Sequence, residues 1–142
     1  MIRPTLPAYD YSLVIRTDFS NDAAWEKICK AIQEPQTEAG FRACVECISD
    51  ESCLEATAAD IVTYLPADPG RTFVFLVDAE TLTHPDHPVL VVDLLEAPGR
   101  SFRVIPSEAW GIENNLRLAN VSFDEFSEVV GADGVFRGFP RP

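Results

Sequence analysis

Two nearly continuous apolar runs constrain the fold of this chain more than any other feature. They span residues 72–78 and 89–95, and almost every residue in them is apolar. Strands with one solvated face alternate apolar and polar residues, whereas strands covered on both faces are apolar throughout. The two runs therefore predict central strands of a sheet that carries helices on both faces.

Shorter patterns predict the remaining elements. Residues 11–18, 41–48 and 101–105 are expected to be strands, and residues 134–139 an edge strand. Ser20 is expected to cap a helix with an apolar stripe from Ala23 to Ile32, which Pro35 ends. Further helices are predicted over 58–65, opened by Thr57 and Asp60; over 108–118, capped by Ser107; and over 123–130, opened by Ser122 and Glu125 and stopped at Gly131.

The order of these elements predicts an α/β fold. We expect a single domain over residues 1–142 with a mixed sheet of five or six strands and helices packed on its faces. The sheet should be parallel in its first half and hairpin-connected in its second. A chain of 142 residues buries roughly 70% of its unfolded surface, so it needs no disulfide or metal to fold. Residues 1–10 are predicted to be a flexible N-terminal segment.

The N-terminus and the cysteines indicate a reducing compartment. No signal-peptide run and no apolar stretch of about 18 residues is present, so we expect a cytoplasmic protein without membrane association. Cys44 and Cys47 have the C-x-x-C spacing but fall inside a predicted strand, where residues three apart face opposite sides. They would then share neither a bridge nor a metal. With Cys29 and Cys53 they are expected to be free thiols, and the sequence indicates no metal and no cofactor.

Four sequence blocks resemble a small family of bacterial proteins. The blocks are residues 13–22, 91–94, 115–126 and 134–139. The family is mostly actinobacterial and is classed as a domain of unknown function. The resemblance implies a bacterial cytoplasmic protein and assigns no catalytic residue.

Polar residues near the ends of predicted elements are candidate ligand-binding residues. Arg16, Asp18 and Asp78 lie where two predicted strands end, and open α/β sheets bind ligands at that edge. The two carboxylates would either hold Mg²⁺ or order the turns that follow the strands. Asn114, Asn115 and Asn120 form a second group, which would either satisfy backbone groups between two helices or bind a polar ligand.

Asp93 interrupts the second apolar run, and a buried carboxylate there must be paired or hydrogen-bonded. We expect a structural pair with an arginine or with backbone N–H groups. Arg103 and Arg137 are the favoured side chains, because both are embedded among apolar residues. The alternative is a carboxylate that faces a ligand.

The negative charge carries most of the functional information. The formal net charge is −12, and residues 41–100 hold eleven acidic and three basic residues. Such a charge argues against nucleic acid, and it either only keeps the protein soluble or steers a basic protein partner. We therefore expect a non-catalytic protein-interaction module, of which a toxin-neutralising immunity protein is one form. The alternative is an enzyme, or a binder of a small molecule or metal, that uses the strand-end residues. No nucleophile elbow or phosphate loop is present, and the oligomeric state is left open.

Overall fold

The computed structural model describes residues 12–65, 71–118 and 121–139, so the segment 1–10 and Asn120 lie outside the described residues. The described part of the chain forms a six-stranded mixed sheet in the order β2-β1-β3-β4-β5-β6. The α/β fold class is confirmed, and the first half of the sheet is parallel as the sequence predicts. In the second half β4 is antiparallel to β3 and β5, but β6 pairs with β5 in parallel, so this last pairing is not the expected hairpin. The strands are β1 (Ser12–Arg16), β2 (Val45–Ile48), β3 (Phe73–Val77), β4 (Val89–Asp93), β5 (Ser101–Val104) and β6 (Val135–Phe136).

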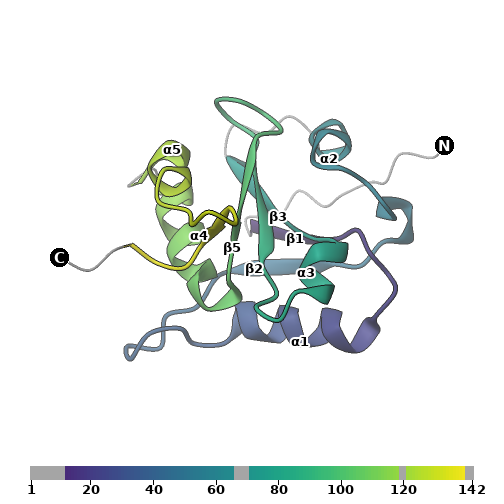
Figure 1. Ribbon diagram of the computed structural model, residues 1–142, viewed down its shortest axis with the longest axis horizontal. Coiled ribbons are helices and arrows are strands. Elements are labelled where there is room, and N and C mark those ends of the chain that lie inside the picture. Colours follow the sequence, from purple (N-terminus) through teal and green to yellow (C-terminus); the bar gives the residue numbers. More distant parts are fainter. Residues whose placement is uncertain (1–11, 66–70, 119–120, 140–142) are drawn as a thin grey trace.

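Helices cover both faces of the sheet, and Figure 1 shows α1 and α2 on opposite sides of the strands. One face carries α1 (Asp22–Gln33), α3 (Ala79–Thr83), α4 (Ala109–Arg117) and α5 (Phe123–Ser127). The other face carries α2 (Ala58–Tyr64) and the short helix η1 (Glu51–Cys53). A second short helix, η2 (Pro106–Glu108), leads into α4.

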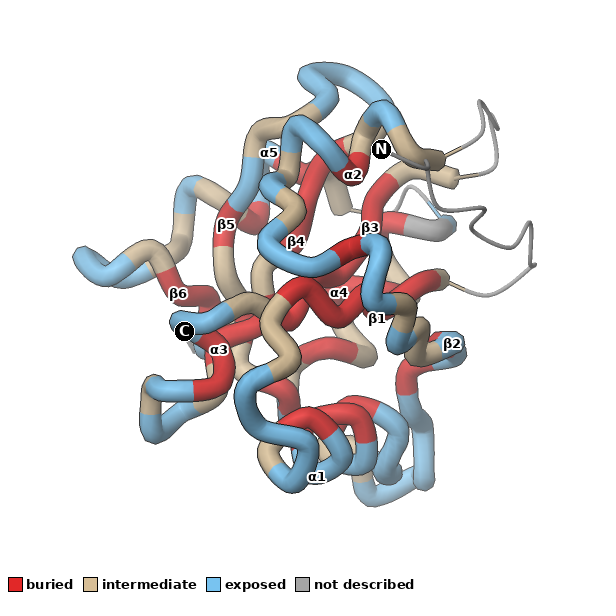
Figure 2. Tube along the Cα trace, turned by 90° about the vertical axis from the view of Figure 1, so that its right-hand side faces the viewer, coloured by how far each residue is buried: buried red, intermediate tan, exposed pale blue. Residues whose placement is uncertain are grey.

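The central position of β3 explains its apolar sequence. It pairs with β1 on one side and β4 on the other, and all five of its residues are buried. Phe73, Phe75 and Val77 belong to the core beneath α1 and α4, whereas Val74 and Leu76 belong to the core beneath α2. Figure 2 shows the buried residues running through the sheet and the exposed residues on the outer turns. Each face of β3 thus holds one of the two cores.

Local capping chemistry places most helix starts, with corrections of a few residues. Thr57 and Asp60 form the predicted capping box of α2, and the Ser122 hydroxyl accepts the Glu125 N–H at the start of α5. The first helix is capped by Asn21 and not by Ser20, because the Ser20 N–H and hydroxyl both donate to Asp18.

Several expected elements differ in extent. The edge strand predicted over 134–139 is only Val135–Phe136, and the strand in the run 89–95 ends at Asp93. The strand predicted over 41–48 pairs with β1 only from Val45 onward, so Cys44 lies before it. Ser107 does not cap a helix, because it lies within η2, and the N-terminus of α4 has no side-chain cap. The last helix ends at Ser127, earlier than expected. The loop expected after β3 contains α3, which Asp78 and Thr81 open with a capping box.

Candidate functional site

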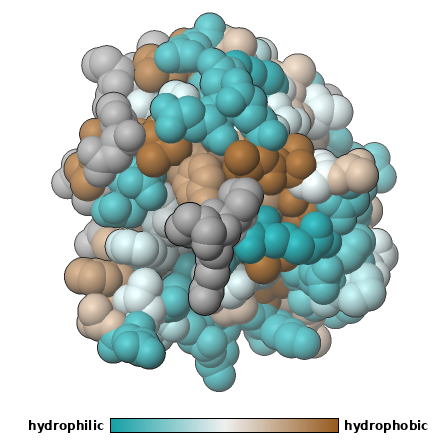
Figure 3. Space-filling view, turned by 60° about the vertical axis from the view of Figure 1, so that its left-hand side comes forward, coloured by the Kyte–Doolittle hydropathy of each residue, from teal (hydrophilic) through white to brown (hydrophobic). Residues whose placement is uncertain are grey.

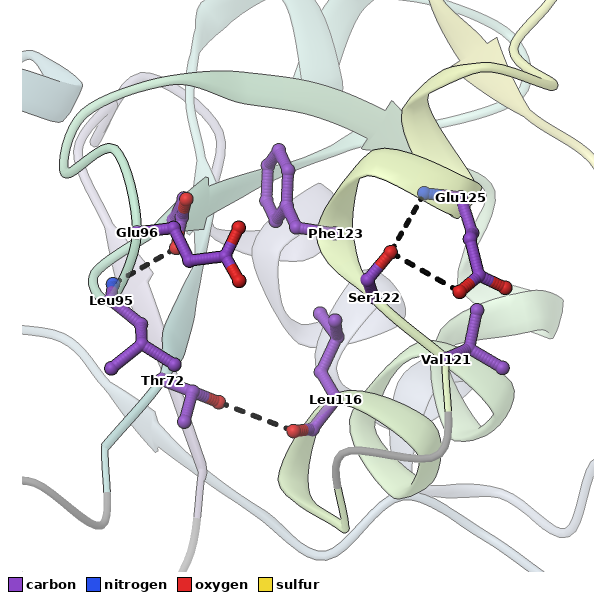
Figure 4. Close-up of a pocket in the computed structure, with 9 residues that line it drawn as sticks. Thr72, Leu95, Glu96, Leu116, Val121, Ser122, Phe123 and Glu125 are labelled. Atoms are coloured by element: carbon purple, nitrogen blue, oxygen red, sulfur yellow. Dashed lines mark hydrogen bonds between the residues drawn. The ribbon is translucent and has the colours of Figure 1, made fainter.

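A pocket of about 240 Å³ lies between the loop that follows β4 and the junction of α4 with α5 (Figure 4). One wall comes from Thr72 just before β3, from Asp93 at the end of β4, and from Leu95 and Glu96 in that loop. The facing wall comes from the end of α4 and the start of α5. The described lining residues are Thr72, Asp93, Leu95, Glu96, Leu116, Val121, Ser122, Phe123 and Glu125.

Apolar side chains form most of the pocket surface. Leu116 and Phe123 are buried at its base, and Leu95 is 59% exposed at its edge. Figure 3 shows hydrophobic side chains gathered near the middle of a face on this side of the molecule, with hydrophilic residues around them. An exposed leucine beside a small apolar hollow suits contact with an apolar group of a binding partner.

Asp93 forms the polar back of the pocket and is almost fully buried. Its carboxylate accepts the Leu95 N–H at 2.9 Å, the Ala97 N–H at 3.0 Å and the Arg100 Nε–H at 2.7 Å. Burial alone would raise the pKa of Asp93, but these three hydrogen bonds outweigh it and hold the pKa below its ordinary value of 3.8. Asp93 therefore stays ionised and acts as the anchor of the loop.

Arg100 links this anchor to the opposite wall. Its guanidinium contacts the carboxylates of Asp93, Glu96 and Asp124, and it lies 4.7 Å from the centre of the Phe123 ring. The loop after β4 is thereby fixed to α5 by an ion-pair network and a cation–π contact. Arg100 thus pairs with two carboxylates that line the pocket, Asp93 and Glu96, and with Asp124 on α5.

The rim of the pocket is acidic. Figure 4 shows the Glu96 carboxylate pointing into the space between the two walls. Glu125 accepts a hydrogen bond of 3.3 Å from the Ser122 hydroxyl. The described lining residues include three carboxylates and no lysine, arginine or histidine. The geometry therefore suits a ligand that joins an apolar body to a positive charge.

The predicted strand-end residues do not line this pocket. The Arg16 guanidinium donates to the Asp18 carbonyl, to Ser49 and to Asp22, and it stacks on Phe19. The Asp18 side chain accepts two hydrogen bonds from Ser20 and so orders the turn before α1. Both residues thus have a local role at the end of β1.

Asp78 and Asn115 are likewise engaged elsewhere, and Asn114 does not line the pocket. Asp78 caps α3 and pairs with Arg103 through both carboxylate oxygens, at 3.0 and 2.7 Å. Asn115 donates to the Gly111 carbonyl one turn earlier in α4, and the Asn114 carbonyl accepts the Leu118 N–H. No group of three or more His, Cys, Asp or Glu residues within the described ranges is placed to hold a metal.

The prediction that Arg103 or Arg137 pairs with Asp93 is wrong. Arg103 pairs with Asp78 and Glu80, and Arg137 pairs with Asp86 and Asp133. Asp93 instead pairs with Arg100, because the intervening loop closes on itself: the Asp93 N–H donates to the Arg100 carbonyl, and the Gly99 N–H donates to the Asp93 carbonyl. The turn-forming residues between Asp93 and Arg100 could have indicated this ion pair, because a tight turn brings an arginine back to a carboxylate seven residues earlier in the chain.

The pocket residues other than Asp93 were not predicted as site residues. Ser122 and Glu125 were assigned only a capping role, and Thr72, Leu95 and Glu96 had no role. They come from three separate segments, and none carries a motif. Only the packing of α5 against the loop after β4 brings them together.

The fold is that of a small α/β domain with a six-stranded mixed sheet. The chain belongs to the family described as domain of unknown function DUF6924, whose family model matches residues 11–139. This match confirms the resemblance to a family of unknown function. No curated protein matches the chain. Within the described ranges, no helix has the length and apolarity needed to cross a bilayer.

We expect the free energy of unfolding to fall as the pH is lowered below about 4. The folded pKa values of Asp78 and Asp93 both lie below the ordinary value, so the unfolded chain binds protons there before the folded chain does. The stabilisation that Asp78 and Asp93 provide is therefore complete at pH values above their pKa in the unfolded chain. It is lost as the pH falls through their pKa in the folded protein.

Urea unfolding at a series of pH values tests this expectation, with Asp93→Asn as the matched variant. The variant should be less stable near neutral pH and show a shallower loss of stability below about pH 4, since one titrating group is removed. An unchanged slope in Asp93→Asn would show that Asp93 does not contribute to acid unfolding.

Proposed function

We propose that this chain is a non-catalytic protein-interaction module that binds a basic partner protein, and that the pocket beside α5 receives a lysine side chain of that partner. The observation that carries the proposal is the composition of the pocket. It combines an apolar base with the carboxylates of Asp93, Glu96 and Glu125, and no described lining residue is cationic. Arg100 pairs with Asp93 and Glu96 of this set and with Asp124, so Glu125 is the lining carboxylate that no ion pair among the described residues reaches.

A lysine side chain matches these features. Its four-carbon stem packs against apolar surface while its ammonium group stays close to polar partners. Leu95, Leu116 and Phe123 offer the apolar surface, and Glu96 offers the carboxylate at the opening. A volume of about 240 Å³ is also below the usual range of small-molecule pockets, about 300–1,000 Å³. The size favours one side chain over a cofactor.

The charge of the remaining surface supports the same kind of partner. Arg16, Arg100, Arg103 and Arg137 each pair with at least one carboxylate. Among the described residues no ion pair reaches the exposed carboxylates of Glu46, Glu51 and Glu55, beside β2 and η1. Unneutralised acidic charge raises the rate at which a basic protein associates.

A toxin-neutralising immunity protein is the most specific form of this proposal, since such a protein would cover a basic surface of its toxin. Co-expression with the product of a neighbouring gene tests that form directly. The alternative, an enzyme at the strand ends, has less support, because Arg16, Asp18 and Asp78 are held in local contacts and do not line the pocket.

Titration with hexylammonium, followed by NMR, tests the proposed pocket chemistry. We expect saturable shifts at Leu116, Val121 and Phe123, whereas 1-hexanol should bind about tenfold more weakly because it lacks the charge, a difference of about 1.4 kcal/mol. Hexanoate should not bind. Glu96→Gln combined with Glu125→Gln should remove the preference for the ammonium.

The matched control is Glu46→Gln combined with Glu51→Gln, which removes the same charge from residues that do not line the pocket. This control should bind hexylammonium as the parent does. Equal binding of hexanol and hexylammonium by the parent, or unchanged binding by the pocket variant, would contradict the proposal.

A further inference from the structure

Two cysteines from different elements lie together between α1 and the edge strand β2. Cys29 is buried on α1 and Cys47 is half-buried on β2. Both belong to, or pack against, the same core, and both line an open cavity of about 400 Å³ on that side of the molecule. This pair is independent of the pocket beside α5.

The sequence pattern of each element explains the juxtaposition. Cys29 belongs to the apolar stripe that α1 turns toward the sheet, together with Trp25, Ile28 and Ile32. In β2, side chains alternate between the two faces, so Val45 and Cys47 point toward α1 while Glu46 points away. The apolar stripe of α1 therefore contributes Cys29, and the side of β2 that faces α1 contributes Cys47.

The two thiols share one environment, since both side chains pack in the same core and line the same cavity. The hydrogen bond with Cys47, followed by burial, raises the pKa of Cys29 far above its ordinary value of 9.0. Cys29 is therefore a protonated thiol at neutral pH and does not react first. Cys47 has the more accessible sulfur, and the cavity beside it gives a small oxidant a route to that sulfur.

We propose that Cys29 and Cys47 form a reversible disulfide when the protein meets a peroxide. The Cys47 sulfur attacks one oxygen of hydrogen peroxide, which breaks the O–O bond and gives Cys47 sulfenic acid and one water. The Cys29 sulfur then attacks the Cys47 sulfur and displaces the hydroxyl group, which leaves as a second water with the Cys29 proton. Two thiols are oxidised to one disulfide, and the peroxide is reduced to two waters.

The neighbouring cysteines do not compete for this bond in the folded protein. Cys44 has the C-x-x-C spacing to Cys47, but it lies before β2 and is exposed, three residues from Cys47. Cys53 is fully buried beneath the opposite face, where burial raises the pKa of its thiol. All four cysteines are free in this structure, so the reduced form is the starting state.

Peroxide treatment of the native full chain, followed by alkylation in denaturant and peptide mass spectrometry, tests the proposal. Cleavage after Glu46 separates Cys44 from Cys47, so the two possible partners of Cys29 can be distinguished. We expect a peptide that links Cys29 to Cys47, alkylated Cys44 and Cys53, and full reversal by dithiothreitol.

Cys47→Ser should abolish the link and leave Cys29 reduced, whereas Cys44→Ser should retain it. Circular dichroism establishes that each variant is folded, and Cys47→Ala replaces Cys47→Ser if the serine variant is not. A link between Cys29 and Cys44 in the parent, or Cys47 oxidised to sulfinic acid while Cys29 stays reduced, would overturn the proposal.

Discussion

Replacing Asp93 by alanine is expected to lower the free energy of unfolding by about 3–5 kcal/mol. The side chain of Asp93 is 3% exposed and holds three donors: the backbone N–H groups of Leu95 and Ala97, and the Arg100 guanidinium. The alanine variant leaves all three without this acceptor. A domain of ordinary stability has about 5–15 kcal/mol in total, so the midpoint of urea unfolding should move far toward zero.

Arg100→Ala is the informative control for this prediction. Arg100 is 31% exposed, and without it Asp93 keeps both backbone donors, so the arginine variant should be destabilised less than Asp93→Ala. Asp124→Ala removes an exposed partner of Arg100 and should change stability by about 0.5 kcal/mol or less. If Asp93→Ala unfolds at the urea concentration of the parent, the anchoring role of Asp93 is wrong.

Replacing Phe126 by alanine is expected to cost about 3–5 kcal/mol as well. Phe126 is 1% exposed at the centre of an aromatic cluster, with ring centres 6.1 Å from Phe102, 5.2 Å from Phe136 and 5.3 Å from Phe139. The alanine variant loses these contacts and leaves a cavity between α5, β5 and β6. Urea unfolding again measures the loss.

The same variant tests the link between core and pocket. Phe126 holds α5 against the sheet, and Phe123 on the same helix contacts Phe102 and lines the pocket. Hexylammonium binding should therefore weaken in Phe126→Ala even where the protein remains folded. Phe139→Ala, in the same cluster but 48% exposed, is the matched control and should cost clearly less. Equal losses in the two variants would show that α5 is not held by Phe126.

The local elements of this fold could be predicted because their causes lie within a few residues. The capping box of Thr57 and Asp60 needs only a hydroxyl and a carboxylate three residues apart, and it is present as predicted. The same reasoning should have found α3, because Asp78 and Thr81 have the same spacing. The prolines that follow, Pro85 and Pro88, lie beyond the end of the helix at Thr83 and do not interrupt it.

Ion-pair partners required the tertiary structure. Asp93, Arg103 and Arg137 all lie in apolar surroundings in the sequence, which indicates burial but does not indicate which residue faces which. In β5, Arg103 points to the side where Asp78 ends β3, and Asp93 is reached by Arg100 through a turn. Strand order and loop closure decide which charged side chains come into contact, and neither can be inferred from a short stretch of sequence.

The two-sided central sheet follows from the sequence, because the apolar residues that become β3 and β4 are stable only when both faces of these strands are covered. The sequence also determined the acidic charge and the starts of α2 and α5. The tertiary structure alone decided the pocket and the cysteine pair. Both are built where separate segments meet: the loop after β4 with α5, and α1 with β2. Periodicity fixes which side of an element faces the core, whereas packing between elements fixes which side chains meet there.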